Sequence, residues 1–140
     1  MKNVFLGMLA VLVILQFIPA KIENYPVDRN LEIKLPDDIM KIFKKACYDC
    51  HSNEVVIPWY QSIAPMSFKI KHHVDLGRKW LNFSEWENYT SEEKDKKLEG
   101  IFRTVYAAMP LESYIWLHPE AELTKEEINR VRDWTGKAPF

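Results

Sequence analysis

The chain is poor in cysteine and glycine and has almost no net charge. Cys47 and Cys50 are the only cysteines among 140 residues, so nothing is left for a disulfide framework or a second metal-binding pair. Four glycines, with no glycine-rich motif, argue against a phosphate-binding loop. A net charge of -1 without a basic stripe argues against nucleic acid as a partner. No Ser-His-Asp arrangement or paired-carboxylate motif is present, so the distinctive chemistry lies at the two cysteines.

The two cysteines belong to the segment Cys47-Tyr48-Asp49-Cys50-His51, which has the pattern C-x-x-C-H. This pattern is the attachment signature of a c-type haem. Two thiols on one helical turn reach the two vinyl groups on one edge of a porphyrin, and the adjacent histidine lies under the iron. We therefore expect thioethers at Cys47 and Cys50, with His51 as proximal iron ligand.

Three other interpretations of the cysteine pair are open. A zinc site would need further ligands, which His72, His73 and His118 offer without a recognisable knuckle pattern. A thioredoxin-like dithiol would follow a strand, whereas the preceding residues have helical periodicity. A structural disulfide within one helical turn is sterically awkward and leaves the histidine unexplained.

The N-terminus carries a nearly continuous apolar run from Val4 to Ala20, preceded by Lys2. Its length is short for a membrane-spanning helix and long for the apolar region of a signal peptide, and Ile18 makes a poor cleavage site. We expect an uncleaved anchor or signal segment over residues 1–20, a polar tether over 21–35 and a haem-binding domain over 36–140. The domain would lie on the periplasmic or extracytoplasmic side of a bacterial cytoplasmic membrane, because the positive end stays inside.

The remaining sequence predicts helices and no strand. Apolar residues at helical spacing predict three helices. The first is capped by Asp37 or Asp38 and runs to the haem motif, the second runs from about Met66 to Trp80, and the third runs from Thr90 to Ala108. A last helix follows Thr124 and ends at Gly136. Three capping boxes are predicted, at the pairs Ser84 with Glu87, Thr90 with Glu93, and Thr124 with Glu127. The fold class is therefore all-α, a small cytochrome c-like helical domain after an N-terminal hydrophobic helix.

The order of these elements resembles a class I cytochrome c: a helix ending in C-x-x-C-H, a middle helix, Met109-Pro110 in a loop and a closing helix. Further segments are similar to the bacterial haem-binding domain family of single-haem, often membrane-anchored proteins; they are Gly77-Arg78, Asn82 to Trp86, Tyr114, His118 to Ala121, and Leu123-Thr124. The resemblance covers roughly residues 35–134. It implies covalent haem c and an all-helical fold.

The distal iron ligand is open on sequence grounds. Met109 is preferred because Pro110 excludes it from the preceding helix and because a thioether opposite histidine raises the potential. His72 or His73 would give bis-histidine ligation, but adjacent helical residues point about 100° apart, so only one can face the iron. His118 and Met66 are weaker candidates. Side chains suited to the haem propionates are Arg78, Arg103, Trp80 and Trp86.

These features predict a membrane-tethered monohaem cytochrome c that passes single electrons to redox partner proteins, an electron carrier and not an enzyme. The alternative is a haem sensor or small peroxidase with an open or exchangeable distal site. A third possibility is a haem-carrying accessory subunit of a larger complex. The state of the sixth iron ligand separates the first two.

Overall fold

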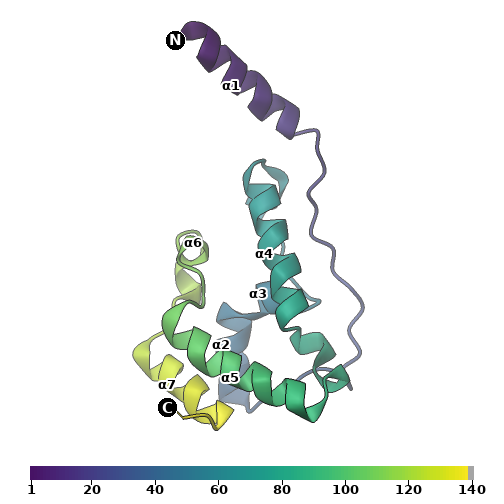
Figure 1. Ribbon diagram of the computed structural model, residues 1–140, viewed down its shortest axis with the longest axis vertical. Helices are drawn as coiled ribbons and strands as arrows, with labels where there is room; N and C mark the ends of the chain where they lie inside the picture. The colour runs from purple at the N-terminus through teal and green to yellow at the C-terminus, as the bar shows by residue number, and fades with distance from the viewer. Residues whose placement is uncertain (139–140) are drawn as a thin grey trace.

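The computed structural model describes residues 1–138, which form helices and contain no strand (Figure 1). The predicted all-α class is therefore confirmed. The α-helices are α1 (Lys2–Leu15), α2 (Asp37–Ala46), α3 (Tyr48–His51), α4 (Met66–Trp80), α5 (Ser91–Ala107), α6 (Glu112–Ile115) and α7 (Lys125–Thr135). Short 3-10 helices are η1 (Trp59–Ser62), η2 (Phe83–Asn88) and η3 (Pro119–Ala121).

The main hydrophobic core lies where α2, α5 and α7 meet. Phe43 of α2 packs against Phe83 of η2 with ring centroids 4.9 Å apart and edge-on against Trp134 of α7 at 5.4 Å. Ile101 of α5 and Val131 of α7 are buried in the same cluster. The apolar positions that predict these helices thus face one another, as the periodicity requires.

Two of the three predicted capping boxes are present. The side chains of Thr90 and Thr124 accept hydrogen bonds from the backbone three residues later, and each partner glutamate bonds back to the cap residue's N–H. Gly136 ends α7 in the left-handed conformation with φ of 65°, which glycine adopts without strain.

Two predicted helix starts are wrong. Pro36, and not Asp37 or Asp38, is the N-cap of α2, and the aspartates lie in its first turn, where their charge favours the helix dipole. At η2 the cap is Asn82, whose side chain accepts a hydrogen bond from the Ser84 N–H. Ser84 is completely buried and its hydroxyl accepts from the Asn53 N–H, so it is not free to form a box with Glu87.

The N-terminal apolar run forms a shorter helix than its composition predicts. Helix α1 comprises 14 residues and ends at Leu15, after which the Gln16 side chain bonds the backbone of Ala64. Among residues 1–138, no helix has both the length and the apolar character needed to cross a membrane. The prediction of a spanning N-terminal helix is therefore not supported.

The segment after α1 runs along the domain instead of standing free of it (Figure 1). Ile22 is buried against Val55 and Val74, and Ile33 enters the main core. The Ile33 N–H also donates to the Phe83 carbonyl at 2.9 Å. We call residues 20–35 the strap. Its polar composition predicts a free tether, whereas in the structure two buried isoleucines, Ile22 and Ile33, hold it against the domain. The proposed boundaries at 20 and 35 stay predictions, and the last two residues of the predicted 36–140 domain lie outside the described residues.

Candidate functional site

A cavity of about 710 Å³ opens between α3, α4, α5 and the segment that follows α5. This volume lies within the usual range for small-molecule and cofactor sites. Its lining is largely apolar and includes Phe43, Leu76, Trp80, Phe83, Ile101, Val105, Leu111 and Val131. The cavity is thus suited to a large apolar group.

The C-x-x-C-H segment forms one wall of this cavity. Cys47 lies between α2 and α3, and its carbonyl accepts from the N–H groups of Cys50 and His51 at 3.2 and 3.0 Å. Both thiols are free, and both cysteines and His51 line the cavity. Burial raises the pKa of Cys47 to about 12 and that of Cys50 to about 11, so both thiols are protonated and uncharged near neutral pH.

The His51 ring is oriented by backbone carbonyls at the end of α4. Its Nδ1 lies 3.1 Å from the Gly77 oxygen and 2.9 Å from the Leu81 oxygen, so Nδ1 carries the proton and donates it. Burial lowers the pKa of His51, opposed by these two hydrogen bonds, so the ring is neutral. Nε2 is then the unprotonated nitrogen, as metal ligation requires.

Helix α4 approaches the motif closely because residue 77 is a glycine. A Cβ placed on Gly77 would lie 2.3 Å from the Cys50 carbonyl oxygen, far inside van der Waals contact. Only glycine lets α4 pack at this distance while its carbonyl accepts from His51. Gly77 is one of the residues on which the resemblance to the haem-binding domain family rests. The sequence does not reveal its structural role, because that role depends on a contact between segments far apart in the chain.

A buried polar network fixes the chain directly after His51. The side chain of Asn82 donates to the Asn53 side chain at 2.8 Å, and the Asn53 amide donates to Glu85 at 3.0 Å. The backbone N–H of Asn53 donates to the Ser84 hydroxyl at 3.0 Å. These bonds join the segment after the motif to η2, which carries Phe83. Phe83 in turn stacks on Tyr48 at 5.3 Å and lies 5.9 Å from the His51 ring.

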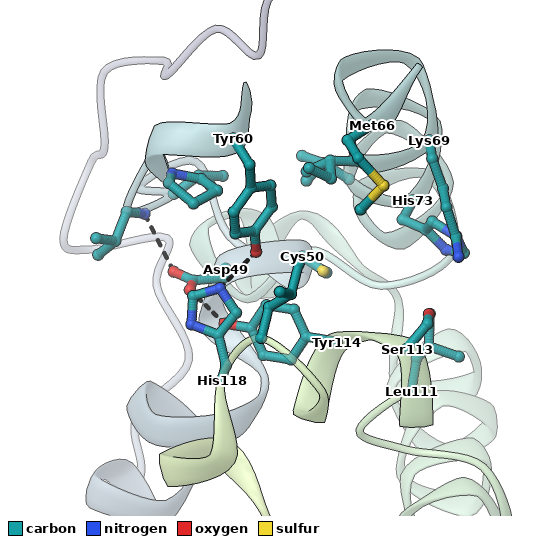
Figure 2. Close-up of a pocket in the computed structure, with 16 residues that line it drawn as sticks. Asp49, Cys50, Tyr60, Met66, Lys69, His73, Leu111, Ser113, Tyr114 and His118 are labelled. Atoms are coloured by element: carbon teal, nitrogen blue, oxygen red, sulfur yellow. Dashed lines mark hydrogen bonds between the residues drawn. The ribbon is translucent and has the colours of Figure 1, made fainter. Parts of the chain in front are cut away.

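The opposite side of α3 is held by Asp49 (Figure 2). One carboxylate oxygen accepts from the Tyr114 hydroxyl at 2.6 Å, and the other accepts from the Val56 N–H at 3.1 Å. Burial and this hydrogen bond raise the pKa of Tyr114, which keeps its hydroxyl protonated as the donor. Asp49 therefore connects the haem motif to the loop that follows it and to α6.

Met109 lies at the cavity on a different segment from the motif. Helix α5 ends at Ala107, and the Met109 N–H donates to the Thr104 carbonyl at 2.8 Å. The residue lines the cavity, beside Pro110 and Leu111. Its exclusion from α5 agrees with the effect expected of Pro110.

The other predicted ligands lie at different places. His73 lines both the large cavity and a smaller neighbouring pocket, whereas His72 lines neither. His118 and Met66 line this smaller pocket on the other side of Cys50, shown in Figure 2. Within residues 1–138, no three His, Cys, Asp or Glu side chains are grouped as metal ligands would be.

The positive charges at the cavity come from α5. Lys96 and Lys97 line it, and neither was singled out by sequence. The Lys96 ammonium pairs with Glu92 at 2.7 Å, and the Lys97 ammonium donates to the Trp80 carbonyl at 2.5 Å. Arg78 faces away, donating to the carbonyls of Ser52 and Glu23, both at 2.7 Å.

The other residues proposed for the propionates occupy different positions. Trp80 lines the cavity, whereas Trp86 is buried in the main core. Arg103 pairs with Glu99 on the exposed face of α5.

Comparison with known proteins agrees with this geometry. Residues 10–137 match the family model described as a haem-binding domain. No curated protein and no solved structure gives a significant match. Since the family model covers most of the chain, this protein belongs to the haem-binding domain family.

Proposed function

We propose that the chain binds haem c covalently through Cys47 and Cys50, that His51 and Met109 would hold its iron, and that the protein transfers single electrons. One observation carries this proposal: the same cavity is lined by both thiols, by the imidazole and by a methionine from a distant segment. The residues fit the group, because the cavity is large and apolar and His51 presents an unprotonated Nε2. When bound, haem supplies one-electron chemistry at its iron.

The protein's own part is to orient ligands and exclude water. The Gly77 and Leu81 carbonyls fix the His51 ring and its tautomer, which also makes the imidazole a stronger donor. Apolar residues of α2, α5 and η2 keep the cavity dry. The methionine thioether favours the reduced state and thus a higher potential.

Lys96 and Lys97 are the side chains that we propose for the propionates. They bring positive charge to the cavity wall formed by α5, and ammonium groups pair with carboxylates. Because the proposed thioethers prevent loss of haem, Lys97→Gln is expected to act at loading and to lower the yield of haem-bearing chain from a haem c maturation system. Lys94→Gln is the matched control, since Lys94 pairs with Glu87 and does not line the cavity.

The proposed setting is the extracytoplasmic face of a bacterial cytoplasmic membrane, with α1 inserted in the bilayer. All of α1 is exposed or nearly so, although it is strongly apolar. An apolar helix without protein contacts needs another apolar environment. The partners would then be redox proteins on that side of the membrane, and turnover of a substrate is not required.

A second function is favoured by one observation: Met109 and His73 line the same cavity, so two side chains compete for the sixth position on the iron. An exchangeable sixth ligand is what a haem sensor or small peroxidase requires. His73, on the same cavity, would be the competing protein ligand.

Absorption spectra separate these functions. The full chain is produced with a haem c maturation system, and wild type is compared with Met109→Ala and with His73→Ala. Electron transfer through His51 and Met109 predicts a weak far-red band of the ferric protein that is lost only in Met109→Ala. If wild type lacks the band and binds cyanide or carbon monoxide readily, the result favours the sensor or peroxidase function over electron transfer. If no haem is attached to wild type, the proposal is wrong.

A further inference from the structure

One end of the domain has an exposed apolar surface built by two loops. We call it the end surface, and it consists of Val56, Ile57, Trp59 and Ile63 before α4 and of Trp116 and Leu117 after α6. Trp59 is 76% exposed and Trp116 is 88% exposed. Indole rings at this exposure have no protein contact that accounts for their apolar area.

The two loops adjoin one another. Val56 and Leu117 line the same small pocket. Beneath it, the Tyr60 hydroxyl lies 2.5 Å from His118 Nε2, and the His118 ring stacks on Tyr114 at 4.4 Å (Figure 2). These contacts hold both loops in place, so the end surface is a fixed feature of the fold.

The end surface lies beside the point where α1 leaves the domain. The Gln16 amide donates to the Ala64 carbonyl at 3.1 Å and its oxygen accepts from the Ala64 N–H at 3.0 Å. The Gln61 amide donates to the Ala20 carbonyl. Figure 1 accordingly shows α1 beyond the N-terminal end of α4, with α2, α5 and α7 at the far end of the molecule.

The chemistry of the end surface favours lipid over a protein partner. In the longer of its two loops, no charged residue or histidine occurs from Val55 to Phe68, although 28% of the chain is charged. The shorter loop is followed by His118, which lies 3.0 Å from Glu120. Docking surfaces for electron-transfer partners depend on complementary charge. Tryptophan, by contrast, is enriched where a protein meets the membrane–water interface, because its ring is apolar and its N–H is polar.

We propose that the end surface lies on the phospholipid bilayer that holds α1, so that the domain contacts the membrane at two adjoining places. This inference rests on the proposed insertion of α1. Trp80, also 72% exposed, is the internal reference. It ends α4, about 21 Å along the helix axis from Met66, and it lines the haem cavity, so it is held away from the bilayer in this orientation.

The test uses the haem-loaded full chain with 5-fluorotryptophan in nanodiscs of phosphatidylcholine and phosphatidylglycerol. Fluorine spectra are compared with and without doxyl-labelled lipid, which removes any effect of the iron. Tryptophan-to-phenylalanine variants assign the signals. The signals of Trp59 and Trp116 should broaden several-fold more than that of Trp80.

The outcomes are distinguishable from failure of the proposed function. If the chain separates from the discs on gel filtration, the insertion of α1 is wrong. If the chain stays with the discs but Trp59 and Trp116 broaden no more than Trp80, the end surface does not contact lipid and this inference is overturned. If these two indoles are shielded from a soluble gadolinium chelate without lipid broadening, the end surface is covered by a second copy or another protein, which also overturns it.

Discussion

Replacing Gly77 by alanine should damage the haem motif without touching a ligand. In an exposed helix this change would stabilise the protein by about 1 kcal/mol. Here the added methyl group meets the Cys50 carbonyl at 2.3 Å, and a backbone atom cannot turn aside as a side chain would. Overpacking of this kind costs about 1–3 kcal/mol.

The shift of α4 would also lengthen the hydrogen bonds from His51 to Gly77 and Leu81, now 3.1 and 2.9 Å. Each is worth about 1 kcal/mol. The costs exceed the gain in helix propensity by about 2–4 kcal/mol, which lowers the urea midpoint by roughly 1–2 M at a typical slope.

The measurement is urea unfolding of the haem-free chain in mild detergent, followed by circular dichroism. Gly100→Ala in α5 is the control, because a Cβ there meets no atom within 4 Å, and it should stabilise the chain. A Gly77→Ala variant as stable as wild type would refute the close approach of α4 to the motif.

Three further substitutions test the surroundings of the site in the same unfolding assay. Glu127→Gln removes the 2.6 Å ion pair with Lys45 and weakens the cap of α7, for a cost of about 1–2 kcal/mol. Lys45 and the Thr124 N–H lower the pKa of Glu127, so the stability that Glu127 contributes is present above the ordinary pKa of glutamate and is lost as pH falls through the lowered pKa. If the stability of Glu127→Gln depends on acidic pH as that of wild type does, this reasoning is contradicted. Asn82→Ala leaves buried polar groups unpaired and should lower the free energy of unfolding by about 1–3 kcal/mol. The control is Asn129→Ala at an exposed position, which should leave the free energy of unfolding almost unchanged. Ile33→Ala in the strap should cost about 2–5 kcal/mol, and a cost near zero would show that the strap is not part of the core.

The sequence predicts local features of the site more fully than its contacts. The haem motif, the exclusion of Met109 from α5 and the caps at Thr90 and Thr124 depend on residues within a few positions of each other. Their patterns can therefore be recognised in the sequence alone.

The features that sequence misses join distant segments. The two carbonyls that orient His51 belong to the end of α4, and the lysines at the cavity belong to α5. Ser84 resembles a helix cap by spacing, but a buried bond to Asn53 takes its hydroxyl. The strap is missed because two isoleucines in a polar segment give no periodicity.

In the membrane-attached electron carrier proposed above, the strap also bears on how the haem would meet its partners. A free tether of this length would let the domain swing between a donor and an acceptor held at different heights above the bilayer. With Ile22 and Ile33 buried and Asn24 bonded to Val55, the segment is a strut of fixed length. Electron exchange would then depend on partners that diffuse to a haem held at a constant height, and lengthening the segment by insertion would not extend its reach in proportion.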